Sequence, residues 1–73
     1  MTKENKEKVA KFIKAQPPKW GTITGDILCY DTVDKKRIDV NFIFDGELFI
    51  SGDDGELYEF SEIELIDERV LNF

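Results

Sequence analysis

Acidic side chains are the groups in this sequence with the most evident capacity for chemistry. The segment Asp53-Asp54-Gly55-Glu56 has the residue types of a calcium-binding loop. An EF-hand, however, requires alternating oxygen ligands and a glutamate at the twelfth loop position. Here the acids fill a short gap between two predicted strands, where aspartate and glycine are favoured for their backbone geometry. We therefore interpret this segment as a solvated hairpin turn and expect no metal site.

Nucleophilic catalysis requires residue pairs that this chain does not contain. The sequence has no histidine and a single cysteine, Cys29, so neither a Ser–His nor a Cys–His pair can form. The same counts exclude an intramolecular disulfide and a Cys/His zinc site. Cys29 alternates with Ile27 and Ile23, which predicts a buried, unreactive thiol. Most of the remaining carboxylates fall in turns or at strand positions facing away from the apolar side, so we expect a non-enzymatic protein without a cofactor.

Charge divides the chain into a basic and an acidic part. The net charge is −6: residues 1–20 carry six lysines against two glutamates (+4), and residues 21–73 carry four basic residues against fourteen acids (−10). The charged N-terminal residues lead into no long apolar run, so we expect neither a secretory signal nor a membrane span. A free thiol without an export signal is typical of a cytoplasmic protein.

A length of 73 residues predicts a single domain, 1–73, that begins with an amphipathic helix over 3–16. Thr2 has the residue type of an N-cap. Pro17 ends the helix, since a proline disfavours the α conformation in the residue before it, and 17–20 form a short stiff hinge. The apolar stripe of this helix has the spacing i, i+3, i+4 and consists of Val9, Phe12 and Ile13.

From residue 21 to residue 67 apolar side chains alternate with polar ones, which predicts an antiparallel β body. The clearest strand spans 37–45, and Asp45-Gly46 after it predicts a tight hairpin. Gly25 lies inside the first predicted strand and indicates a bulge or bend. Further strands are predicted over 21–30, 47–51, 56–60 and 64–67, with a 3₁₀ turn over 60–63. The tail 68–73 fits a strand continuation, a helical turn or a disordered end.

The order of these elements over roughly residues 20–67 resembles an SH3-like small barrel. That fold has a long bent first strand pair, tight hairpins and a 3₁₀ turn before a short last strand. The resemblance implies an α+β, mainly β fold with a four- to five-stranded antiparallel barrel behind an N-terminal helix. An open, curled antiparallel sheet covered by the helix is the alternative. Since no motif accompanies the resemblance, it assigns no functional residue.

Several large apolar or aromatic side chains are candidates for partner contacts. Trp20 follows the hinge, where it either packs over the end of the sheet or anchors a partner. Three residues are candidates for the sheet face opposite the core, which the helix covers or leaves as a contact site: Tyr30, Phe49 and Tyr58. The tail adds three more candidates: Val70, Leu71 and Phe73.

These features favour a small acidic protein-interaction module that binds a protein partner, or itself, through a sheet face, a sheet edge or the tail. An alternative is an inhibitor of a nucleic-acid-binding protein that mimics a phosphate array with its acids, as small phage and mobile-element inhibitors do. A second alternative is nucleic-acid binding by the lysine-rich helix, which the acidic body disfavours electrostatically. We expect no membrane partner.

Overall fold

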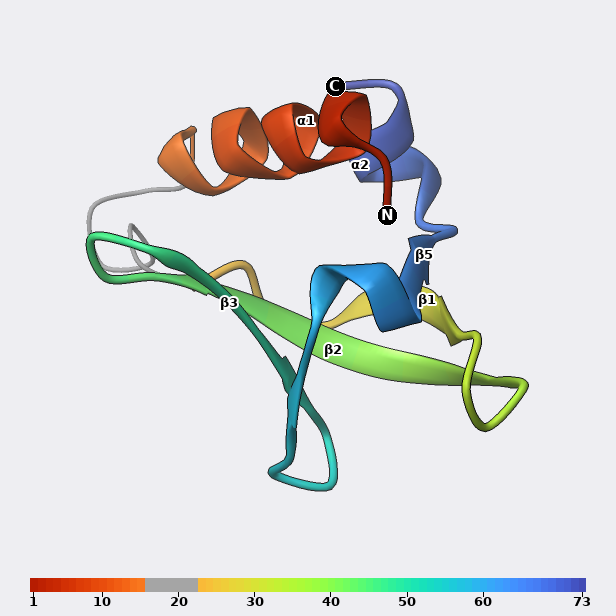
Figure 1. The fold of residues 1–73 in the computed structure, drawn as a ribbon. Coiled ribbons are helices and arrows are strands. Elements are labelled where there is room, and N and C mark those ends of the chain that lie inside the picture. The colour runs from red at the N-terminus through yellow and green to blue at the C-terminus, as the bar shows by residue number, and fades with distance from the viewer. Residues whose placement is uncertain (16–22) are drawn as a thin grey trace.

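The computed structural model of the 73-residue chain describes residues 1–15 and 23–73. The fold is α+β and mainly β, with one N-terminal helix beside a curled, half-barrel antiparallel sheet of five strands in the order β4-β3-β2-β1-β5 (Figure 1). The elements are α1 (Lys3–Lys14), β1 (Ile27–Asp31), β2 (Lys36–Phe44), β3 (Leu48–Gly52), β4 (Leu57–Tyr58), the 3₁₀ turn η2 (Phe60–Glu62), β5 (Ile63–Leu65) and α2 (Glu68–Leu71).

Helix α1 begins where the sequence predicts. The Thr2 hydroxyl accepts a hydrogen bond from the Asn5 N–H at 3.1 Å, which satisfies one of the free amides of the first turn. The helix ends at Lys14, two residues before the expected end, with Ala15 as its C-cap. The proline hinge predicted over 17–20, including Trp20, lies outside the described residues.

The sheet has an inner face that is buried and an outer face that points away from the helices. In β2 the alternation is regular, since Ile38, Val40 and Phe42 are buried while Asp39 between them is exposed. The inner-face residues of the neighbouring strands complete the core: Ile27, Cys29, Ile50, Ile63 and Leu65. Each strand pairs antiparallel with its neighbours.

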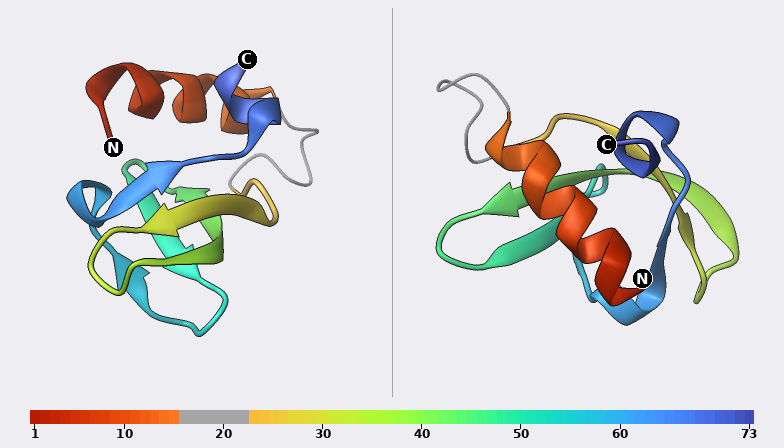
Figure 2. Two further views of the ribbon diagram at one scale, coloured as in Figure 1. Left: turned by 90° about the vertical axis from the view of Figure 1, so that its right-hand side faces the viewer. Right: turned by 90° about the horizontal axis from the view of Figure 1, so that it is seen from above.

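Helix α1 crosses the inner face of the sheet and closes the core (Figure 2). Its Val9 and Ile13 are fully buried, and Val9 belongs to the same apolar cluster as the strands. The amphipathic stripe is therefore core, as its spacing predicts. The sequence left open whether the helix covers the outer face or leaves it as a contact site. In the structure the helix lies on the inner face and does not cover the outer one.

The first predicted strand, 21–30, is wrong in extent and in the face of one residue. Regular pairing starts at Ile27, and before it Ile23 makes only an isolated bridge to Ile43 of the outer face. Gly25, with φ of +78°, lies between the two segments and breaks the alternation, so Ile23 and Ile27 lie on opposite faces. The Thr24 hydroxyl accepts from the Phe42 N–H at 3.0 Å, which holds the bend against β2.

The tail forms the helical turn α2 rather than a strand or a disordered end. Asp67 caps it by accepting from the Arg69 N–H at 2.9 Å. Val70 is fully buried in the core, and the Lys8 ammonium donates to the Leu71 carbonyl at 3.0 Å. These contacts join the last residues of the chain to α1, beside which α2 lies in Figure 1.

Candidate interaction surfaces

The outer face of the sheet carries a row of apolar side chains from three adjacent segments. Ile43 of β2 is directly opposite Phe49 of β3 and forms the isolated bridge with Ile23. Side chains directly opposite in antiparallel strands lie in contact, so these three residues form one continuous apolar strip. We call Ile23, Ile43 and Phe49 the outer row.

Leu57 of β4 extends this apolar surface toward the edge of the sheet. It pairs with Ser51, which places it on the outer face diagonally from Phe49. Leu57 is 72% exposed and Phe49 is 40% exposed. Leu57 was not among the partner-contact candidates predicted from the sequence. Its place two residues after Gly55, at the start of a predicted strand beside a turn, could have indicated an exposed position.

The two tyrosines predicted for the outer face lie on different faces. Tyr30 does lie on the outer face, half-buried between Arg37 and Glu64 of the neighbouring strands. The expectation for Tyr58 is wrong, because it pairs with the buried Ile50 and packs against the core cluster. The two-residue strand β4 gave too few alternations in the sequence to fix its face.

The Tyr58 hydroxyl is part of the turn that the sequence marks as acidic. It donates to Asp54 Oδ2 at 3.0 Å, while Asp54 Oδ1 accepts from the Glu56 N–H at 3.0 Å. Both bonds lower the pKa of the Asp54 carboxyl, and the bond from the Glu56 backbone has the larger effect. The bond to Asp54 raises the pKa of Tyr58 to about 12. The carboxylate thus organises the hairpin turn itself, as an Asx turn does.

The tail candidates divide between core and surface. Val70 is a fully buried core residue, and Leu71 is partly buried against the same cluster. Phe73 is 52% exposed and packs edge-to-face on Phe12, with 5.4 Å between ring centroids. Of the three tail candidates, Phe73 is therefore the one that offers exposed apolar surface to a partner.

The capping carboxylate of α2 is held by an ion pair. Asp67 Oδ2 lies 2.6 Å from Arg69 Nη2, which also donates to the Asp26 carbonyl at 2.8 Å. The side-chain hydrogen bond from Arg69 is the main cause that lowers the pKa of Asp67. This arrangement joins the start of α2 to the segment before β1.

Cys29 is buried, as its alternation in the sequence predicts. Its side chain is fully buried, and burial raises the pKa of the thiol to about 12. A thiol with so high a pKa is a poor nucleophile at neutral pH. Cys29 is thus part of the core.

Asp31 is a buried polar residue that was not among the candidates predicted from the sequence. It is 1% exposed, and its Oδ1 accepts from the N–H groups of Val33 and Asp34 at 3.0 and 3.2 Å. Its Oδ2 has no hydrogen-bond partner among the described residues. Its position before the predicted turn was a usable signal, because aspartate often accepts from backbone amides two or three residues on. Its evident role is to form the turn between β1 and β2.

Three lysines of α1 make contacts within the protein. The Lys6 ammonium lies 4.5 Å from the Phe60 ring centroid, and that of Lys14 lies 5.8 Å from the Phe44 ring centroid. Lys8 is bound to the Leu71 carbonyl and lies 3.8 Å from Glu4. A nucleic-acid-binding surface on this helix would need these ammonium groups to bind phosphates, but here they make contacts within the protein.

The chain matches no protein-family model, no curated protein and no solved structure. Over residues 1–15 and 23–73 there is no group of three or more Asp, Glu, Cys or His side chains placed to hold a metal ion. In the same part of the chain, no helix has the length and apolar character that crossing a membrane requires.

Proposed function

We propose that this protein is a small non-enzymatic interaction module of the cytoplasm, built on an SH3-like small barrel, that binds a protein partner or a second copy of itself. The outer face of the sheet is the proposed contact surface. One observation carries the proposal: the outer row and Leu57 lie on the face opposite the helices, and Phe49 and Leu57 are exposed. Exposed apolar surface of this kind is typical of protein–protein contact sites.

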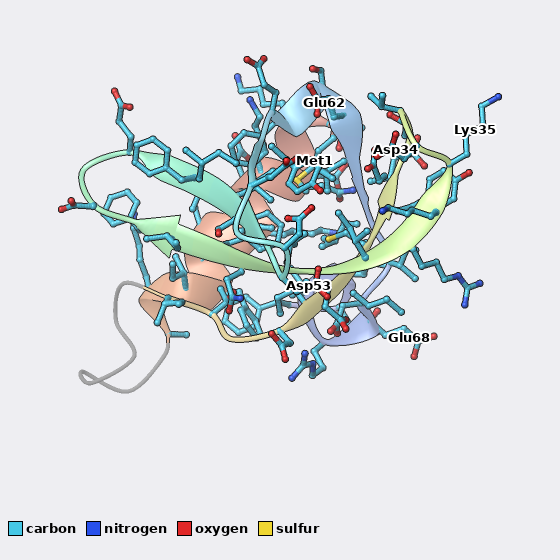
Figure 3. All side chains as sticks on the ribbon, turned by 90° about the horizontal axis from the view of Figure 1, so that it is seen from below. Met1, Asp34, Lys35, Asp53, Glu62 and Glu68 are labelled. Atoms are coloured by element: carbon cyan, nitrogen blue, oxygen red, sulfur yellow. The ribbon has the colours of Figure 1, made fainter. Side chains whose placement is uncertain are left out.

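Mimicry of a phosphate array is less well supported by the positions of the acids. Figure 3 shows Asp34, Asp53, Glu62 and Glu68 pointing in different directions from different elements. A phosphate mimic needs its carboxylates aligned along one edge, so that a basic groove can bind them together. Binding by the lysines of α1 is also less well supported, because three of them are engaged within the protein.

Matched surface variants test the proposal. Phe49→Asp and Leu57→Asp place charge on the outer face, whereas Val33→Asp alters another exposed apolar side chain, 65% exposed, in the turn between β1 and β2. We expect wild type and Val33→Asp to retain the same protein partner, or to self-associate equally in sedimentation equilibrium. The two outer-face variants should lose that partner or that self-association. A strictly monomeric wild type whose partners are retained equally by all three variants would refute the proposal.

A further inference from the structure

A groove runs beneath the start of α1, along the edge of β5 that pairs with no strand among the described residues. It is lined by Met1, Thr2 and Asn5 on one side and by Glu64 and Leu65 of β5 on the other, and its volume is about 440 Å³. The N-terminus lies beside η2 and β5 (Figure 2, left), where the Met1 ammonium donates to the Phe60 carbonyl at 2.6 Å. We call this the β5 groove.

The register of β5 determines which of its backbone groups face the groove. In an antiparallel ladder, hydrogen-bonded pairs alternate with non-bonded pairs. The Thr32 N–H donates to the Glu62 carbonyl, and further along the strand the Ile66 N–H donates to the Leu28 carbonyl. The Leu65 pair with Cys29 is therefore a non-bonded one. Its N–H and C=O point away from β1, toward the open edge.

These edge groups form a site for one more strand. The Ile63 N–H is satisfied by the Phe60 carbonyl of η2, so Ile63 offers only its C=O at the edge. Leu65 offers both N–H and C=O, and neither forms a hydrogen bond within residues 1–15 and 23–73. An extended antiparallel segment could exchange both bonds with Leu65 and donate one more to Ile63. We propose that the β5 groove binds an extended basic peptide segment of a protein partner by strand addition.

The side chains at the edge specify the chemistry of that segment. The residue opposite Leu65 would share the inner face and lie beneath Met1, where an apolar side chain fits. The next residue would lie on the outer face opposite Glu64, which is exposed. A lysine or arginine there would complement its charge, and directly opposed unlike charges stabilise strand pairs. The pattern expected is thus alternating apolar and basic.

Charge also argues for a separate partner rather than a second copy. The other free edge of the sheet, β4, is flanked by Glu56 and Glu59. Pairing β4 of one copy with β5 of another would bring these acids toward Glu64 and Glu62. Like charges directly opposite one another destabilise strand pairs.

The test uses the full chain and two defined peptides, acetyl-TKVKVKT-amide and its acidic counterpart acetyl-TEVEVET-amide. We expect the basic peptide at millimolar concentration to shift amide NMR signals around Leu65 and Met1, and to slow hydrogen exchange of the Leu65 N–H about tenfold in the saturated complex. Shifts that map elsewhere, an unprotected Leu65 amide, or no shifts at all would overturn the inference.

Charge reversal provides the matched control. Glu64→Lys should weaken binding of the basic peptide about two- to fivefold at low salt and strengthen binding of the acidic peptide. Glu56→Lys makes the same change at the opposite edge and should leave both affinities unchanged; equal effects of the two variants would overturn the assignment to β5. The inference deepens the proposed interaction function but uses a separate surface. Phe49→Asp therefore leaves peptide binding intact, and either proposal can fail while the other stands.

Discussion

Removing the two γ-methyl groups of Val70 should destabilise the domain more than any change to the rest of the tail. Val70 is fully buried against the core, although it lies three residues from the last residue of the sequence. Burial stabilises by about 0.8 kcal/mol per CH₂-sized group, and the cavity left by truncation adds to that loss. We expect Val70→Ala to lower the free energy of unfolding by about 2–3 kcal/mol.

A loss of this size is large for a domain with so small a core. Domains of this length have a net stability of ~3–5 kcal/mol, so Val70→Ala should remove about half of it. In urea, with a slope of about 1 kcal/mol per molar, the unfolding midpoint should fall by about 2–3 M. Far-UV circular dichroism measures this midpoint directly.

Val33→Ala is the control, because it removes the same two methyl groups from a side chain that is 65% exposed. It should change the free energy of unfolding by less than about 0.5 kcal/mol. Alanine is also the better helix former, so helix propensity in α2 works against the predicted loss at Val70. Equal midpoints for the two variants would refute the conclusion that the tail belongs to the core.

Three further outcomes follow from the described contacts. Because the folded-state pKa of Asp67 is lowered, mainly by the hydrogen bond from Arg69, its contribution to stability is present above about pH 4 and is lost as pH falls below that value. The free energy of unfolding of Asp67→Asn should therefore fall less than that of wild type between pH 5 and pH 2 in urea titrations. Equal falls in the two proteins would contradict this role of Asp67. The pKa of the Cys29 thiol is raised to about 12 by burial. A thiol reagent at pH 8 should therefore label only urea-unfolded protein. Rapid labelling of the native protein would show instead that the thiol is accessible. Gly52→Ala should cost about 1–3 kcal/mol in thermal or urea unfolding, since a Cβ there would lie 2.5 Å from Tyr58 Cε2; a neutral effect would mean that the ring moves freely.

The elements with many alternations were predictable from the sequence. Residues 37–43 of β2 alternate between buried positions and exposed or partly exposed ones, and the predicted and observed strands differ by one residue at each end. The stripe of α1 and its Thr2 cap are equally local signals, so they too were predictable. The 3₁₀ turn was expected from its position before a short last strand, and η2 spans Phe60–Glu62.

Other features depend on contacts between distant parts of the chain. The face of Tyr58 is set by its pairing with Ile50, and the two residues of β4 carry too little pattern to show it. At Gly25 the sequence indicated a bend, but the reversal of the face of Ile23 follows from the positive φ of that glycine. For Val70, the buried position depends on packing against α1 and the sheet, which no local pattern records.

The candidate surfaces were predictable only in part. Phe49 was expected on the outer face and lies there, whereas Leu57, more exposed, was not singled out. The β5 groove could not be read from the sequence at all, because it depends on which backbone groups of Leu65 the register leaves unpaired.

The bond from the Lys8 ammonium to the Leu71 carbonyl has a consequence for synthesis of the protein. It spans 63 positions, and the bond from Met1 to Phe60 spans 59. Helix α1 leaves the ribosome before residues 60–71, against which the N-terminal residues pack. Since an isolated helix of this length is marginal in water, the early nascent chain exposes its apolar stripe. The native core closes only after Val70 has emerged, so α1 cannot complete its native packing until nearly all of residues 1–73 have been made.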